Sequence, residues 1–351
     1  MATRSRTAVI SALAAALLFG GTTPFAKILA TQMSPVLLAG LLYLGSGLGL
    51  WSFRILRDRR LEVPQLARRD WGCFVGAIVV GGVIAPILLM SGLKQSAASS
   101  ASLLLNFEAV LTALIAWRVF HENTDRRLVF GMLLIVAGGV VLVWPRGGVG
   151  LNSVHGALLI VGACMCWAID NNLTRTVAVA DADFIAGTKG LAAGMTNLVL
   201  AAALSGGFPA PLSALSAMTV GFLGYGVSLV LFVLALRGLG AARAGAYFST
   251  APFLGATIAV VALHEPTPAG FWLSATLMAA GVALHLTERH SHEHSHEVLA
   301  HSHPHTHDAH HEHEHESRWD GSEPHTHEHR HDELTHDHPH YPDAHHHHSH
   351  R

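Results

Sequence analysis

The chain has 351 residues, of which 50% are hydrophobic and 13% are charged, and its formal net charge is −2. A soluble domain carries roughly 25% charged residues, so this composition excludes an ordinary soluble globular protein over most of the length. We expect a lipid bilayer, and no nucleic acid, as a partner of the chain.

Runs of about 20 mostly apolar residues recur along the chain, and each is long enough to cross a hydrocarbon core of roughly 30 Å as a helix. They predict ten spans, at residues 7–29, 34–53, 71–93, 97–119, 127–145, 154–176, 184–205, 215–236, 241–263 and 268–287. Pro24, Pro86 and Pro252 interrupt three of these spans, and a proline kinks a helix and frees a backbone carbonyl group. The predicted fold class is an all-α membrane protein.

The basic residues between the spans indicate an orientation, because cytoplasmic loops carry an excess of Lys and Arg. Placing the N-terminus in the cytoplasm brings one arginine-rich loop to that side, with Arg54, Arg57, Arg59, Arg60, Arg68 and Arg69. We therefore predict a multi-pass protein of the inner (plasma) membrane with both termini in the cytoplasm.

Two stretches of the chain read alike at a constant offset. Residues 98–140 match residues 241–283, and His121-Glu122 corresponds to His264-Glu265, 143 residues further along. Since five spans per copy is an odd number, the second half enters the membrane upside down relative to the first. Such repeats are typical of transporters, in which a site between the halves faces either side in turn. We interpret the two His-Glu turns as helix caps and loop anchors.

Ionisable side chains inside predicted spans are candidate functional groups, because they are costly in lipid unless paired or hydrated. Glu108 lies in the middle of the fourth span, and its counterpart in the second copy is Ala251. Asp170 in the sixth span and Lys189 in the seventh could form a neutralising pair, which would either line a cavity or lock two helices. The residues predicted to line a substrate cavity are Glu108, Asp170, Asn106, Asn171, Lys189 and Tyr247.

The composition changes abruptly at Glu288. Residues 288–351 hold 24 of the 28 histidines and almost no aliphatic residues, so this tail cannot bury a core and is expected to be disordered. Imidazoles beside carboxylates suit Zn²⁺, Ni²⁺, Co²⁺ or Cu²⁺. The alternatives are a solvated extension and a brush that gains charge as pH falls. Candidate metal ligands are His292, His294, His296, His311, His313, His315, His345, His346, His347 and His348.

The two copies resemble the EamA repeat of the drug/metabolite transporter superfamily. The first copy carries the resemblance at 102–114 and Phe120-His121-Glu122, and the second at 247–252 and Leu263-His264-Glu265. The resemblance implies ten helices in two inverted five-helix repeats, at 1–146 and 150–287, around a central cavity. It marks Glu122 and Glu265 as repeat-motif positions and leaves out the tail at 288–351. Members of that family move amino acids, nucleotide sugars, amines and other metabolites, often as exporters.

Two functions remain open at this point. The first is a secondary transporter that exports a small metabolite, such as an amino acid or related compound, with a coupling proton on Glu108 or Asp170. The second is a divalent transition-metal transporter or metal-regulated permease that uses the tail. Neither requires a cofactor, although the tail is expected to bind divalent metal, and a homodimer is a candidate assembly.

Other classes of function are disfavoured by the sequence. Ten spans are far more than a sensor needs as an anchor, and no nucleophile–base pattern indicates an enzyme. The sequence contains no phosphate-binding loop of the G-x-x-x-x-G-K-[ST] kind, so transport is expected to draw on a gradient and not on ATP.

Overall fold

The computed structural model describes residues 2–58, 68–119, 126–144, 151–175, 182–205, 207, 209–239, 241–286, 293–296, 299–305, 325–331 and 334–337 of the chain. By its contacts the chain divides into two units, a body at Met1–Glu288 and a tail at Arg289–Arg351.

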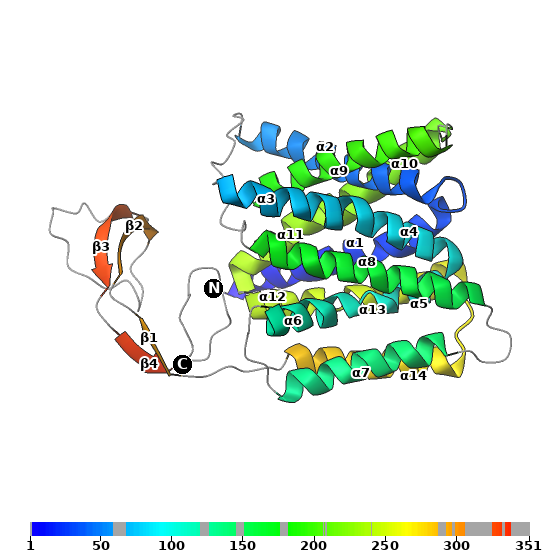
Figure 1. Cartoon of the computed structure of the whole chain (residues 1–351). Coiled ribbons are helices and arrows are strands. Elements are labelled where there is room, and N and C mark those ends of the chain that lie inside the picture. Colours follow the sequence, from blue (N-terminus) through cyan, green and yellow to red (C-terminus); the bar gives the residue numbers. More distant parts are fainter. Residues whose placement is uncertain are drawn as a thin grey trace. The chain divides into compact units, whose positions relative to one another are not determined.

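The body is built from long apolar helices (Figure 1). Six of its segments are single helices: α1 (Ala2–Leu29), α2 (Pro35–Asp58), α7 (Arg126–Val143), α8 (Leu151–Arg175), α9 (Ala182–Ser205) and α14 (Ala269–Leu286). Two segments contain a π-helical stretch: α3 (Arg68–Ala77), η1 (Ile78–Ile84) and α4 (Ala85–Gln95), and α10 (Pro211–Gly221), η2 (Phe222–Val227) and α11 (Ser228–Leu239). Two are broken by a turn: α5 (Ala98–Leu104) and α6 (Phe107–Val119), and α12 (Ala241–Phe248) and α13 (Ala251–Leu263).

These segments account for the predicted spans. Within the described residues, nine are long and apolar enough to cross a membrane, and Ala269–Leu284 is an apolar helix of shorter length. Large apolar side chains such as Leu56 and Leu212 are exposed on the body, as expected for a surface that faces lipid. The predicted all-α membrane fold is confirmed.

Equivalent helices of the two repeats pack against each other. The second spans, α2 and α9, are in extensive contact, and so are the fifth spans, α7 and α14. Figure 1 shows these two pairs at opposite edges of the body. Contacts between the repeats also occur in equivalent pairs. In the first repeat, α4 and α6 both pack on α8 of the second repeat. In the second repeat, the equivalent helices α11 and α13 both pack on α1 of the first. This reciprocity is the relation that two repeats related by a pseudo-two-fold axis produce.

Glycines allow the closest of these approaches. A Cβ atom at Gly45 of α2 would overlap the backbone of Met218 in α10, and one at Gly47 would overlap the backbone of Leu191 in α9. Small residues at such contacts let membrane helices pack backbone to backbone, where dispersion forces and not water exclusion hold them together.

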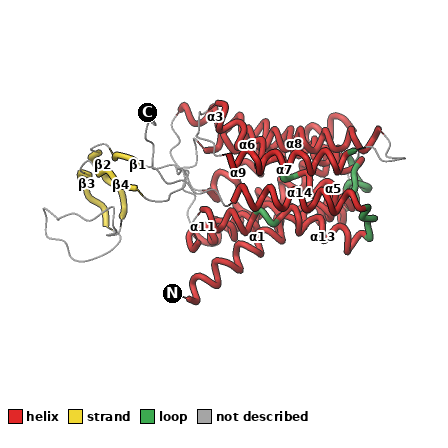
Figure 2. The backbone as a smooth tube through the Cα atoms, turned by 90° about the horizontal axis from the view of Figure 1, so that it is seen from below, coloured by secondary structure: helices red, strands yellow, loops and turns green. Residues whose placement is uncertain are grey.

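Breaks within the spans place turns inside the bundle. In Figure 2 the described loops, drawn green, lie at one end of the body and also among its helices. Pro252 stands in the first turn of α13, directly after one such break, and Pro86 follows η1 at the start of α4. Pro24, in contrast, lies inside α1, which is one continuous helix.

The described part of the tail contains four short strands. Strand β1 (Glu293–His296) pairs antiparallel with β4 (Leu334–Asp337), and β2 (Leu299–His305) with β3 (His325–His331). The disordered tail predicted from the composition remains a prediction for most of residues 288–351, which lie outside the described residues. In the described strands, histidine often recurs at every second residue, a period that fits an extended strand, and antiparallel pairing satisfies the backbone groups without an apolar core.

Candidate substrate site

The fourth and ninth spans break at equivalent points. Leu105-Asn106 separates α5 from α6, and Ser249-Thr250 separates α12 from α13. In the first break, Asn106 Nδ2 donates to the carbonyl oxygen of Leu103 at 2.8 Å. In the second, Ser249 Oγ donates to the carbonyl oxygen of Ala246 at 2.8 Å. Both donors sit three residues after the acceptor, so equivalent polar side chains donate to a carbonyl group in the last turn before each break.

A cavity of about 650 Å³ lies beside these two breaks. Both broken spans contribute to it, and so do α1, α7, α8 and α14. Its described lining is mainly apolar, and Glu108 is the one residue of that lining with a formal charge. The described lining residues are Phe19, Leu105, Asn106, Glu108, Ala109, Thr112, Ala113, Ala116, Ile135, Asn171, Asn172, Gly245, Phe248, Ser249, Ala251, Pro252 and Val282.

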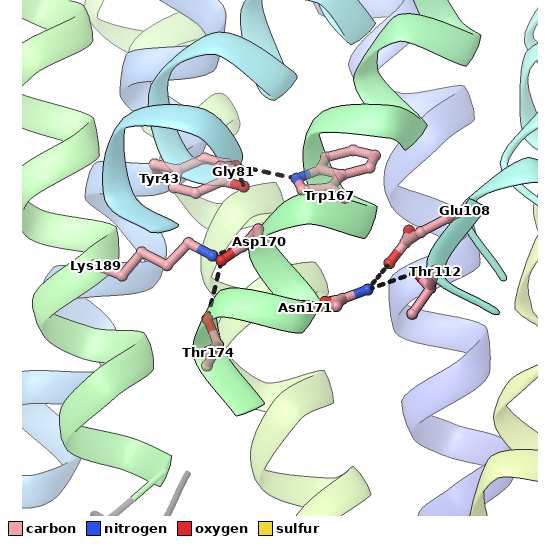
Figure 3. A network of polar contacts seen from close by, with 9 residues as sticks. All are labelled: Tyr43, Gly81, Glu108, Thr112, Trp167, Asp170, Asn171, Thr174 and Lys189. Carbon is pink, nitrogen blue, oxygen red and sulfur yellow. Dashed lines mark hydrogen bonds and ion pairs between the residues drawn. The ribbon is translucent and has the colours of Figure 1, made fainter. Parts of the chain in front are cut away.

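The carboxylate of Glu108 is held from the neighbouring helix. Glu108 stands in the first turn of α6, where the helix dipole favours a negative charge. Asn171 of α8 donates from Nδ2 to Glu108 Oε1 at 2.9 Å, and the same nitrogen lies 3.4 Å from Thr112 Oγ1 (Figure 3). The break that begins α6 therefore directs this carboxylate toward α8, at the wall of the cavity.

Asp170, the residue before Asn171, points elsewhere. Figure 3 shows its carboxylate directed toward Lys189 of α9, and the two side chains form an ion pair. Thr174 Oγ1 donates to Asp170 Oδ1 at 3.0 Å. The predicted neutralising pair is confirmed. Both residues lie outside the described lining of the cavity, as does Tyr247, which packs with Ala12 and its apolar neighbours.

The ion pair lies against the π-helical segment η1. A Cβ atom at Gly81 would overlap the Asp170 carboxylate, so this approach requires glycine. The carbonyl oxygen of Gly81 accepts two hydrogen bonds, from Tyr43 Oη at 3.1 Å and from Trp167 Nε1 at 3.0 Å. Proline has no N–H to return to the preceding turn, so Pro86 leaves a carbonyl group in η1 for side chains to satisfy. The sequence indicated a break at Pro86, but it did not predict that Tyr43 and Trp167 donate to the carbonyl oxygen of Gly81.

Glu265 caps a helix from the other repeat. Its carboxylate accepts the backbone N–H groups of Ala98 at 2.7 Å and Ser99 at 2.8 Å, at the start of α5. Beside it, Lys27 Nζ donates to the carbonyl oxygens of Leu93 at 2.7 Å and Ser96 at 2.8 Å. The predicted capping role of this His-Glu turn is confirmed for Glu265, whereas Glu122 lies outside the described residues.

Comparisons with known proteins identify the architecture. The sequence pattern of the EamA-like transporter family matches residues 6–144 and 154–287. The chain belongs to the EamA-like transporter family. It is similar to an uncharacterized transporter of Methanothermobacter thermautotrophicus, with 28% identity over 288 residues that cover 78% of this chain and 84% of the relative.

Two further proteins resemble this EamA-family chain. An uncharacterized transporter of Bacillus subtilis, YvbV, is 26% identical over 166 residues, which cover 47% of this chain and 52% of the relative. The crystal structure of a further protein superposes with a TM-score of 0.59 at 22% identity, over 79% of this chain and 94% of the other, which shows the shared fold. The chain is thus a multi-pass membrane transporter and not an enzyme, and these relatives name no cargo.

In this EamA-family body, the cavity and the Glu265 cap lie toward opposite ends of the fourth span. The lining of the cavity runs from Leu105 along α6 to Ala116, toward the end of that helix. Glu265 instead contacts the first residues of α5, seven residues before Leu105, which is about 10 Å of helix. The cavity thus lies in the half of the body away from this cap.

The candidate metal ligands of the tail fall beyond what the structure describes. His294 and His296 belong to β1, whose side chains are not described, and the others lie outside the described residues: His292, His311, His313, His315, His345, His346, His347 and His348. Within the described ranges, no three or more His, Cys, Asp or Glu side chains come together as a metal site would require.

Proposed function

We propose that this EamA-family protein is a secondary transporter that exports a small organic metabolite, such as an amino acid or related compound, by alternating access. One observation carries the proposal: a cavity large enough for such a molecule lies where the broken span of each repeat meets the other helices. Transporters of inverted-repeat construction bind cargo at such discontinuous helices near the middle of the membrane.

The symmetry of the two repeats supplies the movement that alternating access needs. Because α6 packs on α8 as α13 packs on α1, an arrangement that opens the cavity toward one side has an equivalent that opens it toward the other. Exchange between the two would pass the cargo across without a continuous pore. Glu108 is the described cavity residue that can also take up a proton, whereas the Asp170 carboxylate is already engaged by Lys189.

A counterflow assay tests this function. Full-length protein is reconstituted in liposomes loaded with one unlabelled amino acid or amine, and uptake of the labelled compound is measured. We expect transient accumulation of at least one compound, and loss of it in Glu108→Gln. Asp70→Asn removes a carboxylate outside the described cavity lining and serves as the matched control. Absence of counterflow for every amino acid and amine would contradict the proposal.

We also propose the orientation with the N-terminus in the cytoplasm. In a variant whose three native cysteines are replaced by serine, Thr31→Cys marks the turn after α1, and Gly72→Cys marks the start of α3. A membrane-impermeant maleimide should label Thr31→Cys in intact cells and Gly72→Cys only after permeabilisation. The reverse pattern would invert the assignment.

Transport of a divalent transition metal stays the second candidate. The tail histidines that suggested it have no described side chains, so the described residues do not test it. The same liposomes, loaded with a metal-sensitive dye, report entry of Ni²⁺, Co²⁺, Zn²⁺ or Cu²⁺. Metal entry without organic counterflow would favour this candidate over the first.

A further inference from the structure

We infer that the cargo of the cavity is an organic cation, an ammonium group on an apolar body, and that Glu108 with Asn171 forms the subsite for its charged end. This inference rests on the proposed function and specifies the class of cargo. It draws on three features of the described residues: the charge of the lining, the absence of a counter-charge within it, and the asymmetry between the two repeats.

The charge of Glu108 is partnered differently from three other charged groups within the spans, Asp170, Lys189 and Lys27. Asp170 and Lys189 neutralise each other, and Lys27 is surrounded by carbonyl oxygens beside the Glu265 carboxylate. Glu108, in contrast, accepts an amide N–H from Asn171 and forms no ion pair with a residue that the structure describes. An ionised carboxylate removed from bulk water is costly unless it gains a counter-charge. An ammonium group on the cargo supplies that counter-charge.

The same reasoning disfavours an anionic cargo. No lysine, arginine or histidine belongs to the described lining of the cavity, so a cargo carboxylate would meet only neutral donors and the negative charge of Glu108. The ammonium group of a zwitterion is attracted by Glu108, but its carboxylate is repelled. A simple amine has the attraction without the repulsion.

The rest of the described cavity lining is mainly apolar and suits an apolar body. The repeat equivalent of Glu108 is Ala251, which lines the same cavity beside Pro252. Phe19 and Phe248 also line it, with ring centroids 5.3 Å apart. Each broken span therefore offers a different surface at the equivalent position, a carboxylate on α6 and apolar groups on α13, and a molecule with one cationic and one apolar end matches both.

Three probes with one apolar body and different charges test the inference. Purified full-length protein is titrated calorimetrically with 2-phenylethylamine (cation), phenylalanine (zwitterion) and 3-phenylpropanoate (anion). We expect affinity in that order. Glu108→Gln keeps the size and the hydrogen bond to Asn171 but removes the charge, and it should weaken amine binding by on the order of ten- to a hundredfold. Asp70→Asn, the matched control, should bind all three as the wild type does.

Glu108→Asp guards against a folding defect, because it keeps the charge and should keep the order of affinities. Anion binding as tight as amine binding, amine affinity retained in Glu108→Gln, or no binding of any probe would overturn the inference. Failure of the proposed function gives a different pattern. Amine-selective binding without counterflow would refute transport and leave the cation subsite, whereas counterflow without charge selectivity would refute the subsite alone.

Discussion

The carboxylate of Glu265 lies 2.8 Å from the backbone nitrogen of Ser99, although 166 residues separate them in the chain. One repeat thus caps a helix of the other. A carboxylate at a helix start satisfies N–H groups that have no intrahelical partner and opposes the helix dipole.

Removing this cap is expected to destabilise the protein. Glu265→Ala loses both hydrogen bonds and should lower the free energy of unfolding by about 1–2 kcal/mol, whereas Glu265→Gln retains one acceptor and should lose less. Thermal unfolding of the purified variants in detergent measures the difference. Equal unfolding temperatures for wild type and Glu265→Ala would show that the contact contributes nothing.

The Asp170–Lys189 pair predicts non-additive substitutions. Asp170→Asn or Lys189→Met alone leaves one buried charge without a partner and should cost about 3–5 kcal/mol of stability. The double variant leaves no charge and should be more stable than either single variant. Unfolding of all four proteins forms a double-mutant cycle, and additive losses would mean that the two groups do not interact.

Gly81 and Gly72 form a matched pair of tests. Gly81→Ala places a methyl group where the Asp170 carboxylate lies, and it should cost at least about 1–3 kcal/mol, as overpacking of a tight site does. Gly72→Ala meets nothing within 4 Å and should be neutral or stabilise α3 by up to about 1 kcal/mol. The yield of folded protein and its unfolding temperature distinguish them. Similar behaviour of both variants would contradict the packing described around η1.

The shared acceptor at Gly81 predicts coupling between Tyr43 and Trp167. Each single change, Tyr43→Phe or Trp167→Phe, leaves the carbonyl group with one donor. The double variant leaves the Gly81 carbonyl group without a side-chain donor, and the free energy of unfolding should fall by about 1–3 kcal/mol beyond the sum of the single effects. A double-mutant cycle by thermal unfolding separates this coupling energy from the packing that is lost when the indole ring of Trp167 is removed. A coupling energy near zero would mean that another group satisfies the carbonyl.

Much of the fold could be predicted from the sequence because it depends on run length and composition. The spans follow from apolar stretches, and the Asp170–Lys189 pair from two opposite charges on consecutive spans. The break at Leu105-Asn106 could not be predicted in this way, because Asn106 lies in a run as apolar as an unbroken helix. The one indication of this break in the sequence is that Asn106 corresponds to Ser249 in the second repeat, where Pro252 marks a break.

The contacts around η1 could not be predicted from the sequence for a different reason. An apolar π-helical stretch has the composition of an α-helix, so η1 and η2 leave no mark in hydropathy. The hydrogen bonds of Tyr43 and Trp167 to the Gly81 carbonyl oxygen depend on how three helices meet in space. The same holds for the cavity, where Asn171 is present and Asp170 is not.

Asp170 and Asn171 are neighbours on α8, and consecutive side chains on an α-helix point about 100° apart. One of them anchors the helix to Lys189 and η1, and the other touches the Glu108 carboxylate. A rotation of α8 about its own axis that withdraws Asn171 from Glu108 would also shift Asp170 relative to Lys189 and η1. A cargo that changes the contact between Asn171 and Glu108 would therefore be expected to change the contact between Asp170 and the third span as well.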